Sequence, residues 1–206
     1  KFYPVPYVST CHGFFKKRLS RKIFPCWGEK VVAISPAVKD HLIQDFNIGE
    51  KRIAVIYNGI DLEKFKVQGS KFKEEVKKEL GLGERPVVSI VARLSDVKGH
   101  VYLLEAMRGV VKEIPAAVLV VAGEGKMKKE LFSRVKKLKL ENNVLFFSDA
   151  VCAQNIFAST DVFVMPSLKE GLGLALMEAM ACGLAVIGSC VGGIKALIND
   201  QETGFL

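Results

Sequence analysis

The chain of 206 residues has no two cysteines separated by two residues, and its five cysteines are odd in number. This pattern argues against a disulfide framework and a zinc ribbon, and it favours a reduced setting. No apolar run reaches the roughly 18–20 residues that span a bilayer. The first residues, Lys1 to Pro6, lack the long apolar core of a signal peptide. These absences together predict a cytoplasmic protein.

The sequence also lacks a starting methionine, and an apolar, strand-like run begins almost at once. The last residues, Thr203 to Leu206, stop where the pattern of another strand begins. We therefore expect the chain to be a piece of a longer protein. Half of its residues are hydrophobic and a quarter are charged, which excludes a disordered tail, a collagen and a coiled coil.

Positive charge is in excess, with 30 Lys and Arg against 22 Asp and Glu. Residues 1–59 hold ten of the cations and four of the acids, so most of the net +8 belongs to them. A basic balance allows nucleic acid, acidic lipid or a phosphorylated small molecule as partner. No recognition-helix, RNP or zinc pattern is present, and we expect no binding to nucleic acid.

A basic, apolar segment near the N-terminus has two interpretations. Its cations, interleaved with phenylalanine, leucine and isoleucine, are Lys16, Lys17, Arg18, Arg21 and Lys22. They form a solvated helix face, or they contact an anionic membrane or a lipid-linked acceptor, as basic amphipathic segments do. The second interpretation predicts a peripheral location at the cytoplasmic membrane face.

Short apolar runs alternate with stretches of helical spacing along the whole chain. The runs are Pro6–Ser9, Val31–Ile34, Ile53–Ile56, Val87–Ala92, Ala117–Ala122, Val144–Phe147, Val162–Met165 and Ala185–Ile187. Several are continuous rather than alternating, as in strands covered on both faces. The alternation predicts an α/β fold with a doubly wound parallel sheet.

The rhythm breaks at Asn58-Gly59, a pair that favours a turn. A charged stretch follows, and a strong strand begins only after Pro86. We place a domain boundary here, so that 1–59 is part of one α/β domain and 60–206 is most of a second.

The segment from Pro166 to Gly183 carries the strongest signal for a ligand site. It follows an apolar run directly, and Gly171 and Gly173 let the backbone come close to a ligand. A helix beginning near Leu174 points unpaired N–H groups at the same place. This indicates an anion or polyhydroxyl site at the carboxyl end of a strand.

Two carboxylates of this segment suit the recognition of sugar hydroxyls. Glu170 lies in the loop and Glu178 lies in the helix, and each carboxylate accepts two hydrogen bonds from a vicinal diol. The alternative is that Glu178 is a solvated helix residue and that the glycines only form a tight turn.

Four weaker signals accompany this segment. Arg93 ends a strand and Lys98 is expected to begin the next helix. The two could grip a diphosphate, although a strand-terminal Arg is often a surface residue. Gly123 begins a Gly-Glu-Gly turn that could line a base pocket or only join a strand to a helix. His12 could reach across a cleft or be structural. Gly192-Gly193 is a second backbone approach point or simply a loop. Asp96 and His100 are expected on a turn and on a helix surface.

Together these residues resemble the group 1 (family 4) glycosyltransferases. The pattern runs through Cys11-His12-Gly13, Ile34-Ser35, Asn58-Gly59-Ile60-Asp61, Arg93, Lys98-Gly99, Gly123-Glu124-Gly125, Glu170-Gly171-Leu172-Gly173, Glu178 to Gly183, and Gly192-Gly193. The resemblance implies a GT-B architecture of two Rossmann-like domains with the active site between them. It also implies transfer of a sugar from a UDP-, GDP- or ADP-linked donor to a glycan or lipid acceptor, with retention of configuration and without metal or other cofactor.

The resemblance further implies a role for each matching residue. Arg93 and Lys98 would hold the donor diphosphate, Glu178 the ribose, and Glu170 the sugar hydroxyls. His12 would reach the sugar from the first domain. The implied donor contacts also include Gly123, Gly171, Leu172, Gly173, Leu174 and Gly193.

Three departures from the family pattern limit these roles. The first half of the N-terminal domain is missing, Ser148-Asp149 stands where many relatives have glycine, and Lys195 stands where relatives often carry Glu. We therefore expect the chain to bind nucleotide weakly and to transfer little sugar. A catalytically silent nucleotide-sugar-binding module on the same fold is the main alternative, and a sugar-nucleotide epimerase is a more distant one.

Overall fold

The computed structural model of the chain describes residues 5–16, 27–65, 69–148 and 152–206. Within them lie two parallel sheets, one of order β1-β2-β3 and one of order β6-β5-β4-β7-β8. The strands are β1 (Val8–Cys11), β2 (Lys30–Ala33), β3 (Ile53–Val55), β4 (Val87–Val91), β5 (Val118–Ala122), β6 (Val144–Phe147), β7 (Val162–Met165) and β8 (Ala185–Gly188). Each apolar run thus overlaps a strand, although β1 begins two residues later than expected. The predicted α/β class with parallel sheets is confirmed.

Helices alternate with the strands along the chain, as parallel strand pairing requires. The α-helices are α2 (Pro36–Phe46), α3 (Ser70–Glu79), α4 (His100–Glu113), α5 (Lys128–Leu138), α6 (Ala153–Ser159) and α7 (Leu174–Ala181). Four short 3₁₀ turns complete the described elements: η1 (Glu50–Arg52), η2 (Leu62–Phe65), η3 (Asp96–Lys98) and η4 (Gly192–Ala196). None of these helices is long and apolar enough to cross a membrane.

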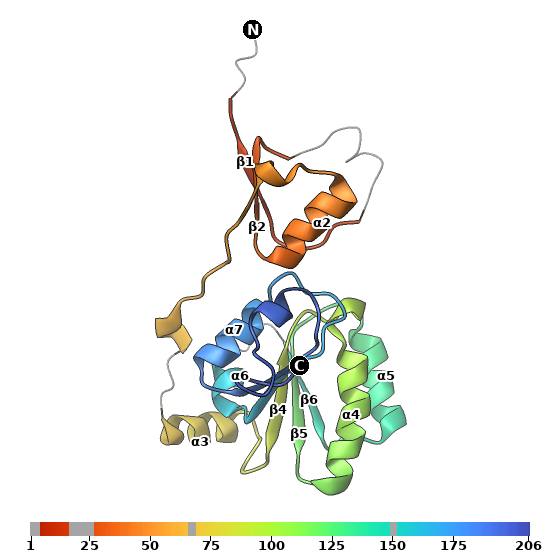
Figure 1. Ribbon diagram of the computed structural model, residues 1–206. Coiled ribbons are helices and arrows are strands. Elements are labelled where there is room, and N and C mark those ends of the chain that lie inside the picture. Colours follow the sequence, from red (N-terminus) through yellow and green to blue (C-terminus); the bar gives the residue numbers. More distant parts are fainter. Residues whose placement is uncertain (1–4, 17–26, 66–68, 149–151) are drawn as a thin grey trace.

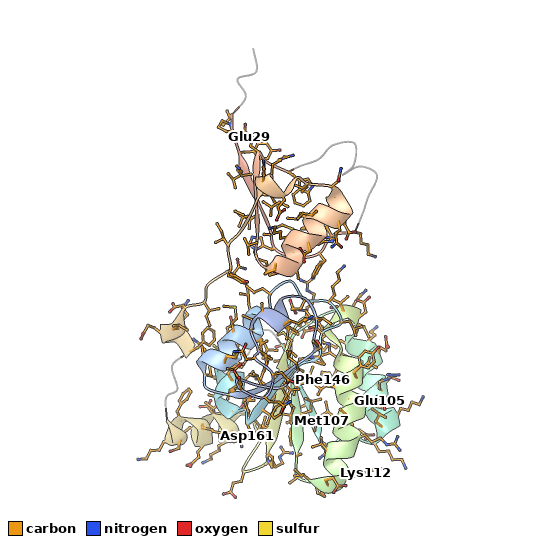
Figure 2. The ribbon with its side chains drawn as sticks, viewed as in Figure 1. Glu29, Glu105, Met107, Lys112, Phe146 and Asp161 are labelled. Carbon is orange, nitrogen blue, oxygen red and sulfur yellow. The ribbon has the colours of Figure 1, made fainter. Side chains whose placement is uncertain are left out.

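The five-stranded sheet is covered on both faces. Strand β5 is buried along its whole length, and alternate residues serve opposite layers. Leu119 and Val121 pack with Met107 of α4, which is labelled in Figure 2, and with Leu131 of α5. Val118, Val120 and Ala122 pack with Ile156 of α6 on the other face. Burial on both faces explains the continuous apolar runs of the sequence.

The strand order places a topological switch point between β4 and β7. The chain runs outward from β4 through β5 to β6, and then returns to the other side of β4 with β7 and β8. The connections that follow β4 and β7 therefore leave the sheet in opposite directions and open a crevice at its carboxyl edge. Arg93 follows β4 and Glu170 follows β7, so this crevice receives the residues that the sequence singled out.

The three-stranded sheet and α2 pack directly on the loops above this crevice (Figure 1). Their buried cluster contains Val31, Ile34 and Leu42, together with Leu172 from the far part of the chain. The Ser35 hydroxyl is fully buried, caps the N-terminus of α2, and donates to the Gly171 carbonyl at 2.5 Å. The two sheets therefore share one apolar cluster and one buried hydrogen bond.

Two local expectations near Lys98 are wrong. Lys98 does not begin a helix; it ends the turn η3, and α4 begins at His100 after Gly99 in the left-handed region (φ 72°). His100 is not on the helix surface, because its side chain is 3% exposed. Asp96, in contrast, lies exposed on the turn as expected.

Asp161 (Figure 2) joins α3 to the start of the large sheet. Its carboxylate lies 2.6 Å from Lys73 Nζ and accepts the Val87 amide at 2.8 Å. Burial by itself would raise the pKa of Asp161, but the Lys73 and Val87 hydrogen bonds and the charges of Lys73 and Lys77 lower it below its ordinary value. A lowered carboxyl pKa stabilises the fold at neutral pH, and this stability is lost as the pH falls through the folded-state pKa.

We therefore predict that Asp161→Asn lowers the free energy of unfolding at pH 7 by about 0.5–1 kcal/mol, a modest value because the carboxylate is partly exposed. The difference from the unaltered chain should shrink as the pH falls below about 4, the ordinary carboxyl pKa, and through the lower folded-state pKa of Asp161. Urea unfolding at several pH values measures it. Asp61→Asn, at a more exposed ion pair, is the control and should change little. A difference for Asp161→Asn that is independent of pH would contradict this assignment.

Candidate functional site

A cavity of about 250 Å³ opens at the switch point and is lined from both sheets. Its lining residues are His12, Ile34, Asn58, Val91, Lys98, Met165, Glu170, Leu172, Gly173, Leu174 and Ala175. The chain thus brings together six of the residues that the sequence singled out, from segments far apart along the chain. Sequence spacing alone could not predict that Asn58 and Ile34 line the same space.

An ion pair joins the two charged residues of this cavity. Lys98 Nζ lies 2.5 Å from Glu170 Oε2, and the two side chains are 22% and 12% exposed. The Ser167 hydroxyl donates to the same oxygen at 3.3 Å. Among the described residues both bonds go to Oε2 and none goes to Oε1, so Glu170 keeps one oxygen with which to accept ligand hydroxyls.

Gly99 allows Lys98 to reach Glu170. A side chain at Gly99 would place its Cβ 1.8 Å from the Pro166 carbonyl oxygen, so only glycine lets the two loops meet. The Leu168 amide donates to the Val97 carbonyl at 2.8 Å and holds the same two loops together. The backbone that follows β7 is therefore built against the backbone that follows β4.

The loop from Glu170 to Gly173 leads into α7. Gly173 adopts a left-handed conformation (φ 98°), and its carbonyl accepts the amides of Leu176 and Met177. No side chain caps this helix, so the amides of Leu174 and Ala175 lie at an uncapped N-terminus that lines the cavity. Such amides, aided by the helix dipole, favour an anionic group.

The diglycine supports the Glu170 loop from behind. The Gly193 amide donates to the Glu170 carbonyl at 3.0 Å, and a Cβ at Gly192 would lie 1.9 Å from that oxygen. The sequence left open whether Gly192-Gly193 is a point of close backbone approach or simply a loop. The close approach is present, but it is made to the backbone of the Glu170 loop. A direct contact of Gly193 with a donor stays a prediction.

His12 follows β1 and lines the cavity from the first sheet. Its loop is fixed by a residue that sequence reasoning missed. His41 of α2 accepts the Phe15 amide on Nε2 at 3.0 Å, and its Nδ1 lies 2.5 Å from Asp45 Oδ2. The only signal in the sequence was the spacing of His41 and Asp45, four residues apart on one helix face.

Five candidate residues lie outside the lining of this cavity: Gly171 and Gly193, whose backbone contacts are given above, and Arg93, Gly123 and Glu178. Arg93 is exposed beyond the end of β4. Gly123 donates its amide to the Phe147 carbonyl at 3.0 Å, in a strand-to-helix turn. Glu178 is half-buried in α7, and desolvation raises the pKa of its carboxyl group. Burial and the charge of Glu178 in turn raise the pKa of the Cys182 thiol, one helical turn further on.

The basic segment is mostly beyond the described residues. Lys16 is exposed, while Lys17, Arg18, Arg21 and Lys22 lie outside the part of the chain that the structure describes. Its predicted contact with an anionic surface stays a prediction.

Sequence comparison decides the family. The profile of the group 1 glycosyl transferases matches residues 72–206, and that of glycosyltransferase family 4 matches residues 1–64. The chain belongs to the group 1 glycosyltransferases. It is 32% identical over 97% of its length to the UDP-Gal:alpha-D-GlcNAc-diphosphoundecaprenol alpha-1,3-galactosyltransferase of Escherichia coli, of which it covers 55%. The chain spans about half the length of the curated relatives that it matches.

Solved structures agree with this membership and confirm the GT-B fold. Anabaena HepE in complex with UDP and glucose superposes with a TM-score of 0.81 at 28% identity, covering 87% of this chain and 49% of HepE. A glycosyltransferase of Rickettsia africae superposes with a TM-score of 0.82 at 25% identity, covering 96% of this chain and 55% of the other. HepE has also been solved with UDP-glucose.

The buried His100 of this group 1 glycosyltransferase lies beside the Lys98 loop. Within the described residues neither ring nitrogen has a hydrogen-bond partner. Burial first, and then the positive charge of Lys98, lower the pKa of His100 to about 4, with the Ser95 carbonyl opposing them. The imidazole is therefore neutral at pH 7.

A His whose pKa is lower when folded than when unfolded opposes folding at acid pH. The unfolded chain binds more protons between about pH 4 and 6.5, so stability should rise with pH across that window, by at most about 1.4 kcal/mol per unit. We predict that His100→Leu removes this slope and stabilises the chain at pH 5, because leucine leaves no buried nitrogen unpaired. Urea unfolding between pH 4.5 and 7.5 measures both, and an unchanged slope in the variant would refute the assignment.

Proposed function

We propose that the chain is the donor-binding region of a retaining glycosyltransferase that uses a nucleotide-diphosphate sugar. The observation that carries this proposal is the cavity at the switch point, which combines the Lys98–Glu170 pair with the uncapped N-terminus of α7. A cation and free amides suit a diphosphate, and a carboxylate suits sugar hydroxyls. The complexes of HepE with UDP and with UDP-glucose support the same ligand class.

The proposed reaction places negative charge at this site. The bond from the sugar C1 to the β-phosphate oxygen breaks, the acceptor oxygen bonds to C1, and the acceptor proton is released to the diphosphate or to solvent. Catalysis requires fixed positive charge where the diphosphate leaves. We assign this role to Lys98, to the exposed Arg93 and to the amides of the 171–174 backbone, without a metal ion or another cofactor.

The remaining contacts follow the family pattern. Glu170 would accept sugar hydroxyls on its second carboxylate oxygen, and His12 would approach the sugar from the first sheet. Glu178 would accept the ribose hydroxyls, with Gly123 near the base. The presence of Arg93 and Glu178 together with the cavity residues favours a transferase over a silent module of the same fold.

A lipid-linked acceptor fits two observations. The E. coli relative is named for an acceptor carried on diphosphoundecaprenol. The sequence of this chain places its excess positive charge in residues 1–59, including Lys16. We propose that this part meets an anionic membrane face on the cytoplasmic side, where such an acceptor would be presented.

A thermal-shift panel of UDP, GDP and ADP sugars tests donor binding. One class should raise the melting temperature, because a ligand that binds only the folded state stabilises it. Arg93→Ala and Glu178→Ala should abolish the shift. Arg108→Ala, an exposed cation on α4, is the matched control and should leave it unchanged. A shift that persists in both site variants would show that the assigned site is wrong.

Transfer is tested separately, with a radiolabelled donor of the class that binds. The chain spans about half of its relatives, and we expect it to bind donor while transferring little or no sugar. Robust turnover by the 206-residue chain would contradict this expectation.

A further inference from the structure

The two charged residues of the cavity are bonded to each other. Lys98 and Glu170 lie 2.5 Å apart, and both side chains are more than three-quarters buried. In a site this enclosed, charges act strongly on each other and are poorly screened by salt. Any anion that binds here must therefore share or displace the bond between Lys98 and Glu170.

The cavity offers little other positive charge to such an anion. Lys98 is the only lysine or arginine among the described residues that line it. The neighbouring Lys169 points elsewhere, with its Nζ 4.5 Å from the centre of the Phe14 ring. Within the lining, the attraction of this cavity for phosphate thus depends on one ammonium group and on backbone amides, and the exposed Arg93 lies outside the lining.

Glu170 is held in place from two directions. Its Oε2 accepts the hydroxyl of Ser167, a residue 1% exposed, and its backbone carbonyl accepts the Gly193 amide. The carboxylate therefore stays at the cavity whether or not a sugar occupies it. Its negative charge is a constant feature of the site.

The nucleotide sugar and the nucleoside diphosphate left after transfer would interact differently with the Glu170 carboxylate. In the proposed binding mode the sugar of a nucleotide sugar would lie between the Glu170 carboxylate and the phosphates, and its hydroxyls would donate to Glu170. After transfer the sugar is absent, and the terminal phosphate carries about −1.5 to −2 charge near pH 7, as phosphate monoesters do. That phosphate then faces Glu170 with no donor between them, and both anions seek the same ammonium.

We propose that Glu170 competes with the terminal phosphate of the spent nucleoside diphosphate for Lys98, so that it selects nucleotide sugar over nucleoside diphosphate and promotes product release. This inference rests on the proposed function. It gives Glu170 a second role beside sugar recognition, in which the ion pair of Glu170 with Lys98 re-forms as the product leaves.

Isothermal titration of UDP and UDP-glucose, or of the pair selected by the thermal-shift panel, tests the proposal. Glu170→Gln keeps the shape and removes the charge. We expect it to bind the nucleoside diphosphate about threefold to tenfold more tightly, and the nucleotide sugar more weakly. Glu170→Asp, which draws the carboxylate away from Lys98, should give a smaller gain and serves if the amide variant folds poorly.

Two comparisons sharpen the result. Glu178→Gln, at the carboxylate assigned to the ribose that both ligands share, should weaken both by a similar factor. Lys98→Met should weaken the nucleoside diphosphate, and in that background Glu170→Gln should give much less gain, because there is no ammonium left to release.

The outcomes separate the proposal from the function on which it rests. If the unaltered chain binds neither ligand, the proposed function fails and this inference fails with it. If Glu178→Gln weakens both ligands but Glu170→Gln also weakens both equally, the donor site stands and the competition is refuted. A gain from Glu170→Gln that is undiminished without Lys98 likewise overturns it.

Discussion

The loop from Glu170 to Gly173 is fixed from both sides, and the rest of the site depends on this. The buried Ser35 hydroxyl donates to the Gly171 carbonyl, and the Gly193 amide donates to the Glu170 carbonyl. Leu172, the next residue, belongs to the apolar cluster of the first sheet. A backbone tied to both halves of the structure cannot shift without loss of buried hydrogen bonds, each costly to leave unmade.

This fixed loop sets the electrostatics of the cavity. Gly99 brings Lys98 to the loop, and the ion pair to Glu170 forms where solvent is largely excluded. The same positive charge reaches His100 behind the loop and adds to the burial that keeps its imidazole neutral. The cavity therefore presents one cation and one carboxylate in a fixed arrangement, which is the preorganisation that charge-separating chemistry requires.

The sequence predicted the sheet strands well, because continuous apolar runs have few other uses in a chain of this composition. The sequence also predicted the Glu170 loop and α7, because the glycines of the loop and the apolar residues of the helix can be recognised without knowledge of their tertiary contacts. It failed at His100 and missed His41, whose surroundings are made by tertiary packing. Nothing local to a histidine reveals which strands or loops will close over it.

The ion pair between Lys98 and Glu170 is the clearest example of a tertiary contact that the local sequence does not predict. Lys98 and Glu170 are each conspicuous in the sequence, and the family pattern assigns them to different parts of one ligand. Their bond arises from strand order: β4 and β7 are neighbours although two strands and three α-helices separate them along the chain. The topology thus couples Lys98 and Glu170 electrostatically. A ligand group that binds one of these side chains changes how strongly the other binds its own ligand group.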